Sequence, residues 1–243
     1  MTDLAGRVAL VTGGSRGIGR AIAVSLAEAG AVVAVNYREK AAEAEAVAQA
    51  VRANGGKAVT VRADVSQAGE VARMIAEVAR TLGPIDVLVN NAGIGLVRSV
   101  DDLTEADFDL TIAVNLKSVF LCTQAVIPGM RQRKWGRIVN ISSGAARGAG
   151  GVGPHYNASK AGMEGMTRSY AARLVKDGIT VNALAPSLIE TDMVKQGVAS
   201  SPARIPLGRF GTPQECADVV MLLVGNAYMT GQTVALSGGL SFL

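Results

Sequence analysis

Short apolar runs alternate with helical stretches along the whole chain, and this alternation constrains its fold more than any other feature. We expect strands at residues 8–11, 31–35, 58–62, 85–89, 137–141, 179–184 and 233–236. Helices are expected between them at residues 18–29, 40–53, 67–82, 104–131, 157–175 and 213–224. Apolar strands separated by helices are typical of a parallel sheet covered on both faces. The sequence therefore predicts an α/β fold, and we expect residues 1–243 to form a single domain because no linker interrupts them.

Composition excludes several other classes of protein. Apolar residues make up 49% of the chain and charged residues 18%, which favours a buried core over disorder. Cys122 and Cys216 lie inside apolar stretches and there is one histidine, so we expect no disulfide framework, no metal site and a reducing cytoplasm. The first residues show no signal-peptide pattern, and we expect no membrane span because no apolar run approaches roughly 18 residues. A net charge of +4 is too small to indicate nucleic-acid binding.

A glycine-rich turn joins the first expected strand to the first expected helix, and it reads Thr12-Gly13-Gly14-Ser15-Arg16-Gly17-Ile18-Gly19. Gly13 allows a tight turn, Gly17 lets a diphosphate approach the backbone, and Gly19 lets the helix pack closely on the strand. The amides at the start of the helix then face the anion. The alternative is a tight turn without a ligand, but the surrounding strand–helix–strand pattern favours a dinucleotide site.

The end of the second expected strand bears on which dinucleotide is bound. A carboxylate there would bind the ribose 2′-hydroxyl of NAD, but Tyr37 and Arg38 occupy these positions and the first acid is Glu39. Arg38 and Arg16 together suit the 2′-phosphate of NADP through charge-assisted hydrogen bonds. Two solvated surface arginines are the alternative. We expect NADP(H) as the cofactor.

Tyr156 and Lys160 stand four residues apart on an expected helix and therefore share one face of it. A phenol has an ordinary pKa near 10, and a neighbouring ammonium lowers that pKa by favouring the phenolate. The pair could donate a proton to a carbonyl oxygen. Ser143 directly follows the fifth expected strand, and the carboxyl ends of parallel strands line the ligand crevice in such sheets.

Taken together, five motifs resemble the short-chain dehydrogenase/reductase family, in its order and spacing, over residues 4–242. They are Thr12-Gly13-x-x-x-Gly17-x-Gly19, Asn90-Asn91-Ala92-Gly93, Asn115, Ser143 and Tyr156-x-x-x-Lys160. Within the family, the N-terminal half and residues 205–211 are most similar to β-ketoacyl-acyl-carrier-protein reductases. The resemblance implies a Rossmann-type doubly wound parallel sheet of roughly seven strands with helices on both faces.

The resemblance also implies roles for four catalytic residues. Tyr156 would protonate the substrate oxygen as hydride arrives, and Ser143 would polarise the carbonyl. Lys160 would lower the tyrosine pKa and bind the nicotinamide ribose. Asn115 would hold a water in a proton relay.

For the cofactor, the resemblance implies that Asp64 contacts adenine, that Asn91 to Gly93 pack along the ribose, and that Ile189 and Thr191 contact the nicotinamide carboxamide. The expected cofactor-binding residues are Gly13, Ser15, Arg16, Gly17, Ile18, Gly19, Tyr37, Arg38, Asp64, Val65, Asn91, Ala92, Gly93, Tyr156, Lys160, Pro186, Ile189 and Thr191.

Three positions depart from the family pattern. Pro186 is followed by Ser187 instead of glycine, and residues 192–204, the expected substrate lid, are several residues shorter than usual. Asp177 stands where these reductases often carry a basic residue suited to an acidic carrier protein.

Other residues are open to two interpretations. The basic cluster at residues 131–137, around Trp135, is either a carrier-docking surface or a solvated helix end. We expect His155 to line the mouth of the site at most, and Met163 and Met166 to pack in the core or against a neighbouring subunit.

The expected function is reduction of a ketone to a secondary alcohol with NADPH. A β-ketoacyl thioester is the leading substrate, a small free ketone comes next, and an acyl carrier protein is a candidate partner. The alternatives are an NAD(P)-dependent alcohol or sugar dehydrogenase acting oxidatively, and a non-catalytic NADP-binding sensor, which would lack part of the catalytic set. We expect a homotetramer, because small residues on the helix at 157–175 allow close approach of a second copy: Ala158, Ala161, Gly162 and Gly165.

Overall fold

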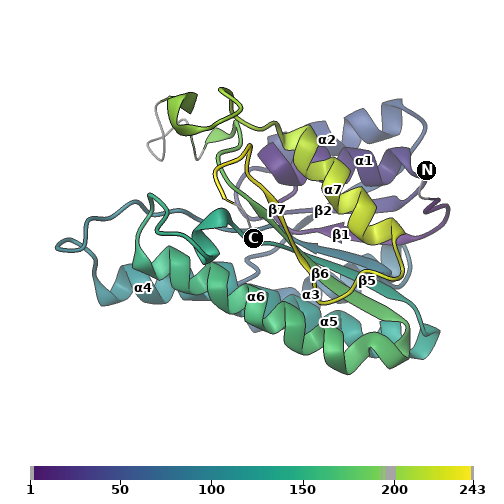
Figure 1. Cartoon of the computed structure of the whole chain (residues 1–243). Coiled ribbons are helices and arrows are strands. Elements are labelled where there is room, and N and C mark those ends of the chain that lie inside the picture. The colour runs from purple at the N-terminus through teal and green to yellow at the C-terminus, as the bar shows by residue number, and fades with distance from the viewer. Residues whose placement is uncertain (1–2, 193, 195–200, 242–243) are drawn as a thin grey trace.

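The computed structural model describes residues 3–192, 194 and 201–241, and it contains one seven-stranded parallel sheet in the order β3-β2-β1-β4-β5-β6-β7 (Figure 1). The strands are β1 (Val8–Val11), β2 (Val32–Tyr37), β3 (Lys57–Arg62), β4 (Val87–Asn90), β5 (Gly136–Ile141), β6 (Ile179–Pro186) and β7 (Thr233–Leu236). The helices are α1 (Gly17–Glu28), α2 (Ala41–Ala53), α3 (Ala68–Thr81), α4 (Glu105–Ile112), α5 (Ser118–Arg133), α6 (Pro154–Leu174) and α7 (Pro213–Gly225). The predicted α/β fold and its parallel sheet are confirmed.

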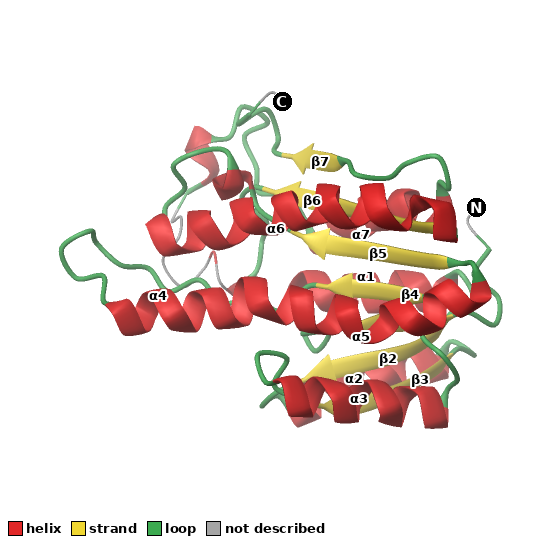
Figure 2. Cartoon of the chain, turned by 90° about the horizontal axis from the view of Figure 1, so that it is seen from below, coloured by secondary structure: helices red, strands yellow, loops and turns green. Residues whose placement is uncertain are grey.

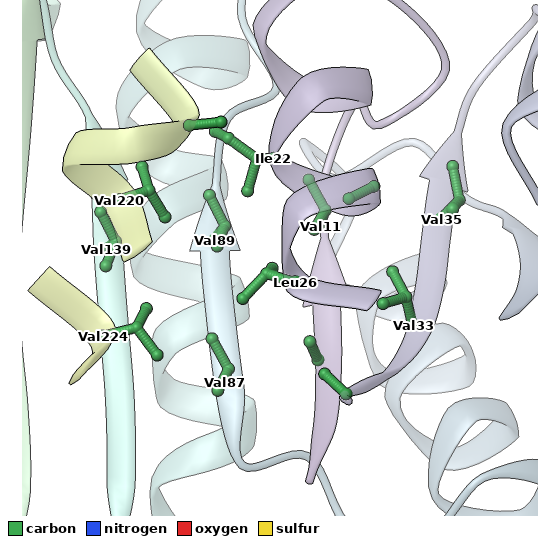
Figure 3. Packing of buried hydrophobic residues seen from close by; sticks show 14 of the residues in the cluster. Val11, Ile22, Leu26, Val33, Val35, Val87, Val89, Val139, Val220 and Val224 are labelled. Carbon is green, nitrogen blue, oxygen red and sulfur yellow. The ribbon is translucent and has the colours of Figure 1, made fainter. Parts of the chain in front are cut away.

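Side chains that alternate along each strand divide the core between the two faces of the sheet. Ala9 and Val11 of β1 pack with α1, α2 and α7 on one face, while Val8 and Leu10 pack with α3, α5 and α6 on the other. Figure 3 shows side chains of α1 and α7, among them Ile22 and Val220, lying over β1, β4 and β5. Helices α3, α5 and α6 lie across the opposite face (Figure 2). Burial on both faces explains why these strands are apolar throughout.

The strand order reverses direction beside β1. The chain passes from β1 through β2 to β3, and then crosses back so that β4 pairs with the other side of β1. A reversal of this kind leaves a crevice at the carboxyl ends of the two strands, and ligands of doubly wound sheets bind there.

The single long helix predicted at residues 104–131 is divided into two α-helices in the structure. Helix α4 begins with a capping box in which Thr104 and Asp107 bond each other's backbone amides, and it ends at Ile112. A π-helical segment, Ala113–Lys117, then joins it to α5. Such segments occur mostly as single turns within α-helices, frequently at functional sites. The break surrounds Asn115, one of the expected catalytic residues.

The continuous helix formed by α4, the π-helical segment and α5 corrects the expectation that no apolar stretch is long enough to span a membrane. Residues Glu105–Arg133 form 29 helical residues with a mean hydropathy of 1.6 in their most apolar window, which is long and apolar enough to span a membrane by composition. Half of that window is buried, and the helix packs against α3, α6 and the strands β4 and β5. The apolar character therefore has a packing partner within the fold.

Candidate active site

A cleft of about 590 Å³ opens at the carboxyl ends of the strands, toward which the arrowheads in Figure 2 point. Every expected catalytic and cofactor-binding residue lines this cleft except Asn115, which lies behind its wall. The sequence interpretation missed other lining residues, of which the most informative are Asn36, Lys40, Ser142, Ser187, Glu190 and Asp192.

The glycine-rich turn forms a tight cradle at one side of the cleft. Gly13 adopts a φ of +61°, and a Cβ there would lie 3.0 Å from the Cα of Ala92. A Cβ on Gly19 would collide with Asn91 Nδ2 and with the carbonyl oxygen of Gly13. Among the described residues no side chain caps α1, which starts at Gly17 directly after the turn. The first amides of α1 therefore suit an anion such as a diphosphate.

Polar side chains tie this turn to the neighbouring strands. Asn91 Nδ2 donates to the carbonyl oxygens of Thr12 and Gly13, each at 3.0 Å. Asn36 Oδ1 accepts from the Gly13 amide at 3.2 Å, while Asn36 Nδ2 donates to Val61 O and Ala63 O. The role of Asn36 escaped the sequence interpretation, although a lone amide side chain in an apolar strand was a signal for it.

Ser143, Tyr156 and Lys160 meet at the other side of the cleft. Helix α6 begins at Pro154, three residues earlier than predicted, so that Tyr156 lies in its first turn. Tyr156 is 8% exposed and Lys160 4% exposed, and the Ser143 hydroxyl hydrogen-bonds the Tyr156 phenol. Lys160 Nζ donates to the Ile141 carbonyl oxygen at 2.8 Å and lies 5.7 Å from the centre of the Tyr156 ring.

Burial is the main cause of the pKa shifts of Tyr156 and Lys160. Desolvation raises the pKa of Tyr156, and only the hydrogen bond with Ser143 opposes that rise. Desolvation also lowers the pKa of Lys160 to about 8. The prediction that Lys160 lowers the pKa of the Tyr156 phenol below its ordinary value is therefore wrong. A phenol with a raised pKa stays protonated at neutral pH, as a proton donor must.

Asn115 is fully buried in the π-helical segment. Its Oδ1 accepts from the Ile94 amide at 2.8 Å, and its Nδ2 donates to Ile94 O at 2.9 Å and to Ser159 Oγ at 3.3 Å. These contacts join α6 to the loop after β4. Holding a water in a proton relay stays a prediction.

Exposed charges line the side of the cleft where Arg16 and Arg38 lie. Arg16 Nη1 lies 3.0 Å from Asp192 Oδ2, and Arg38 Nη2 lies 2.7 Å from Glu39 Oε1; all four side chains are about half exposed or more. Asp64 Oδ1 accepts from the amide and hydroxyl of Ser66 at 2.9 and 2.7 Å. Both predicted arginines therefore reach the cleft, each with an acidic neighbour.

Residues beyond β6 line the end of the cleft nearest Ser143. A Cβ on Gly144 would lie 2.7 Å from Ser187 Oγ, so the serine that replaces the family's glycine packs beside the Ser143 segment. Ile189 is buried and forms a bridge with Gly211. Most of the expected lid, residues 193 and 195–200, lies outside the described residues.

Burial decides between the interpretations of His155 and Met163. His155 is fully buried and its Nε2 lies 2.9 Å from Leu96 O, so the expectation that it lines the mouth of the site is wrong. Met163 is also fully buried in the core, while Met166 is half-buried.

Three basic side chains of the cluster at residues 131–137 pair with acids, and Arg137 donates to backbone carbonyl oxygens. Asp177 bonds Arg131 and Lys134 at 2.8 and 3.2 Å, and Arg133 pairs with Asp86 at 3.1 Å. The Trp135 ring lies between the guanidinium groups of Arg7 and Arg137, 3.9 and 4.4 Å from its centre. The cluster precedes and starts β5, and therefore sits at the end of the sheet opposite Ser143. Arg131 and Lys134 are 52% and 70% exposed at the end of α5, so the cluster fits a solvated helix end with paired charges better than a free basic surface.

Comparison with known proteins decides the family. Residues 7–201 match the short chain dehydrogenase model. The chain belongs to the short-chain dehydrogenase family. A 3-oxoacyl-acyl-carrier-protein reductase of Synechocystis is 43% identical over 99% of this short-chain dehydrogenase and 99% of that protein. A Staphylococcus aureus reductase of the same name is 43% identical over 96% of this chain and 97% of its own.

Solved structures agree with the assignment. A putative gluconate dehydrogenase from Agrobacterium tumefaciens superposes with a TM-score of 0.93 and 35% identity, covering 99% of this short-chain dehydrogenase and 98% of that chain. A short-chain type dehydrogenase/reductase from Mycobacterium marinum gives 0.94 and 34%, covering 98% and 97%. These likenesses confirm the predicted Rossmann-type fold.

Proposed function

We propose that this protein is an NADPH-dependent ketoreductase, in which the whole chain acts as one domain. The observation that carries the proposal is the meeting of Ser143, Tyr156 and Lys160 in the cleft that also holds the glycine-rich cradle. A proton donor and a dinucleotide site in one cleft are what carbonyl reduction needs. The 3-oxoacyl reductases that are 43% identical to the chain support this reaction class.

The cradle fits a dinucleotide, since Cβ atoms at Gly13 and Gly19 would fill it and the amides of α1 face it. We infer that Ser15 and Ile18 complete this diphosphate contact, and that Arg16 and Arg38 bind the 2′-phosphate. The remaining cofactor contacts are assigned to Tyr37, Asp64, Val65, Asn91, Ala92, Gly93, Pro186, Ile189 and Thr191, all in the cleft wall. When bound, NADPH supplies the hydride.

The chain's own residues then manage the substrate oxygen and its proton. Tyr156 Oη donates its proton to that oxygen as negative charge develops on it, and Ser143 Oγ donates a hydrogen bond to the same oxygen. The Lys160 ammonium stabilises the phenolate that remains and binds the nicotinamide ribose. Asn115 keeps the loop after β4 against α6, beside the path of a proton relay.

For the substrate, we propose a β-ketoacyl thioester first and a small free ketone second, with an acyl carrier protein as a candidate partner. Asp177 neutralises the basic side chains near it, which reduces attraction for an acidic carrier. An oxidative alcohol or sugar dehydrogenase is the second candidate, because the chain is 35% identical to the putative gluconate dehydrogenase.

Initial rates test these assignments. One β-ketoacyl group is presented free, on coenzyme A and on carrier protein, beside a set of polyols, each with NADP(H) and NAD(H). We expect NADPH-driven reduction, with the carrier-bound form favoured by less than about a hundredfold in kcat/KM. Faster polyol oxidation would support the second candidate, and absence of turnover with all substrates would overturn the proposal.

We also propose a cytoplasmic homotetramer. Two free, buried cysteines, whose thiol pKa values burial raises to about 12, fit a reducing compartment. On α6, Ala158 and Ala161 are exposed, and a Cβ on Gly165 would meet nothing within 4 Å, so a second copy could approach closely. Light scattering at micromolar concentration tests this, and a monomer would contradict it.

A further inference from the structure

An ion pair with a buried carboxylate and a partly exposed arginine lies behind the segment that carries Ser143. Glu164 is 3% exposed and follows Tyr156 and Lys160 at four-residue intervals on the same face of α6. Its Oε2 accepts from Arg147 Nε at 2.9 Å, and its Oε1 lies 3.3 Å from Ser142 Oγ. A buried carboxylate is costly unless it is paired, so these contacts hold their partners firmly.

The two partners bracket Ser143 along the chain. Ser142 directly precedes it, and Arg147 ends the short 3-10 turn Gly144–Ala146 that follows it. Within this turn Ser143 Oγ accepts from the Ala145 amide at 3.2 Å. The same carboxylate therefore anchors the Ser143 segment on both sides.

Composition explains why the segment needs an anchor. Five of the ten residues from 144 to 153 are glycines, which carry no side chains to pack and lose the most conformational freedom on ordering. Arg147 is the one charged residue among these ten. Its guanidinium pairs with Glu164 and so ties the glycine-rich segment to the helix that carries Tyr156 and Lys160.

We propose that Glu164 is a positioning residue for Ser143: through Arg147 and Ser142 it holds the Ser143 hydroxyl against the Tyr156 phenol. The inference rests on the proposed function, since the value of that position lies in polarising a substrate carbonyl. Displacement of a catalytic group by about 1 Å can cost a hundredfold in rate. The alternative is a pair that stabilises α6 and has no specific effect on catalysis.

Glu164→Gln tests the proposal, with Asp86→Asn as the matched control. Asp86 is another nearly buried carboxylate bonded to an arginine, but it lies at the opposite end of the sheet. We expect E164Q to lower kcat by about tenfold to a hundredfold with the KM for NADPH within about twofold. D86N should lower the melting temperature to a similar degree and leave kcat within about twofold. Unchanged kcat in folded E164Q would overturn the proposal.

The Ser143→Ala background separates positioning from general stabilisation. If Glu164 acts through Ser143, adding E164Q to S143A should change the residual rate by less than about twofold. A loss of the same factor in both backgrounds would overturn the proposal. Arg147→Gln removes the pair from its more exposed side and provides the same test if E164Q does not fold.

Hydrogen exchange tests the anchoring role of Glu164 without measuring turnover. In E164Q the amides of residues 144–147 should exchange at least tenfold faster, while those of β5 should not change. Unchanged protection of residues 144–147 would overturn the proposal. If the wild-type protein reduces no ketone, the proposed function fails, and this measurement still decides whether Glu164 anchors the segment.

Discussion

The two sides of the cleft are built differently. On the catalytic side, Tyr156, Lys160 and Glu164 are buried. Tyr156 hydrogen-bonds Ser143, Lys160 donates to a backbone carbonyl oxygen, and Glu164 accepts from Arg147. On the side proposed to bind the adenosine, Arg16 and Arg38 are about half exposed and pair with exposed acids. Packing fixes the geometry of the first group, whereas solvent and salt screen the second. Changes on the catalytic side should therefore act on kcat, and changes on the adenosine side on cofactor affinity and its salt dependence.

The largest effect should come from Tyr156→Phe, which removes the proton donor and leaves the ring. We expect kcat to fall by roughly 10²–10⁴-fold while NADPH affinity, measured by fluorescence titration, stays nearly unchanged. Tyr170→Phe, on the same helix but bonded to Gln124, is the control and should retain full turnover. A Tyr156→Phe protein with wild-type kcat would place the chemistry elsewhere.

Arg38→Asp should change cofactor affinity and leave the catalytic side unaffected. It removes a charge-assisted phosphate contact, worth about 1.5–3 kcal/mol, and adds repulsion, so NADPH affinity should fall by about tenfold to a hundredfold. Saturating kcat should change little, and the loss should diminish as ionic strength rises. Arg52→Asp on α2, which pairs with Glu45, is the control. Equal use of NADH and NADPH by the wild-type protein would contradict this interpretation.

Lys160 links the two sides in the proposed mechanism, because it is assigned both to the chemistry and to ribose binding. Its pKa is lowered to about 8, so the ammonium is present below pH 8 and is lost as the pH rises above that value. We expect NADPH affinity to weaken above pH 8, approaching tenfold for each pH unit. In Lys160→Ala this pH dependence should disappear from the titration curve, and its persistence would assign it to another group.

The smallest effect concerns Asp192, which bonds Arg16 and would compete with a cofactor phosphate for it. An exposed pair of this kind is worth about 0.2–1 kcal/mol. Asp192→Asn should therefore tighten NADPH binding by about two- to fivefold in low salt, and the gain should vanish near 1 M salt. Asp102→Asn, which removes an acid on the loop before α4, should leave the affinity unchanged. Weaker binding in Asp192→Asn would indicate that this acid helps to hold the cofactor.

The sequence predicted those parts of the site that depend on local patterns. The strand, the glycine-rich turn and α1 follow one another within a few residues, and Tyr156 and Lys160 share a helix. The roles of Asn36 and Asp192 escaped prediction, because their partners are distant in the chain. Burial is equally non-local, and for this reason the direction of the Tyr156 pKa shift was mispredicted.

The π-helical segment Ala113–Lys117 adds a residue to the helix without changing the face that α5 presents to the sheet. A π-helical turn carries more residues than an α-helical one, and each residue in an α-helix advances it by about 100°. The buried row Cys122, Val126 and Met130 on α5 faces the sheet. Deleting one residue from Ala113–Lys117 would restore a regular α-helix and leave this row facing the sheet, but it would displace Asn115 from Ile94. The extra residue therefore serves the wall of the cleft, because the packing of α5 on the sheet does not depend on it.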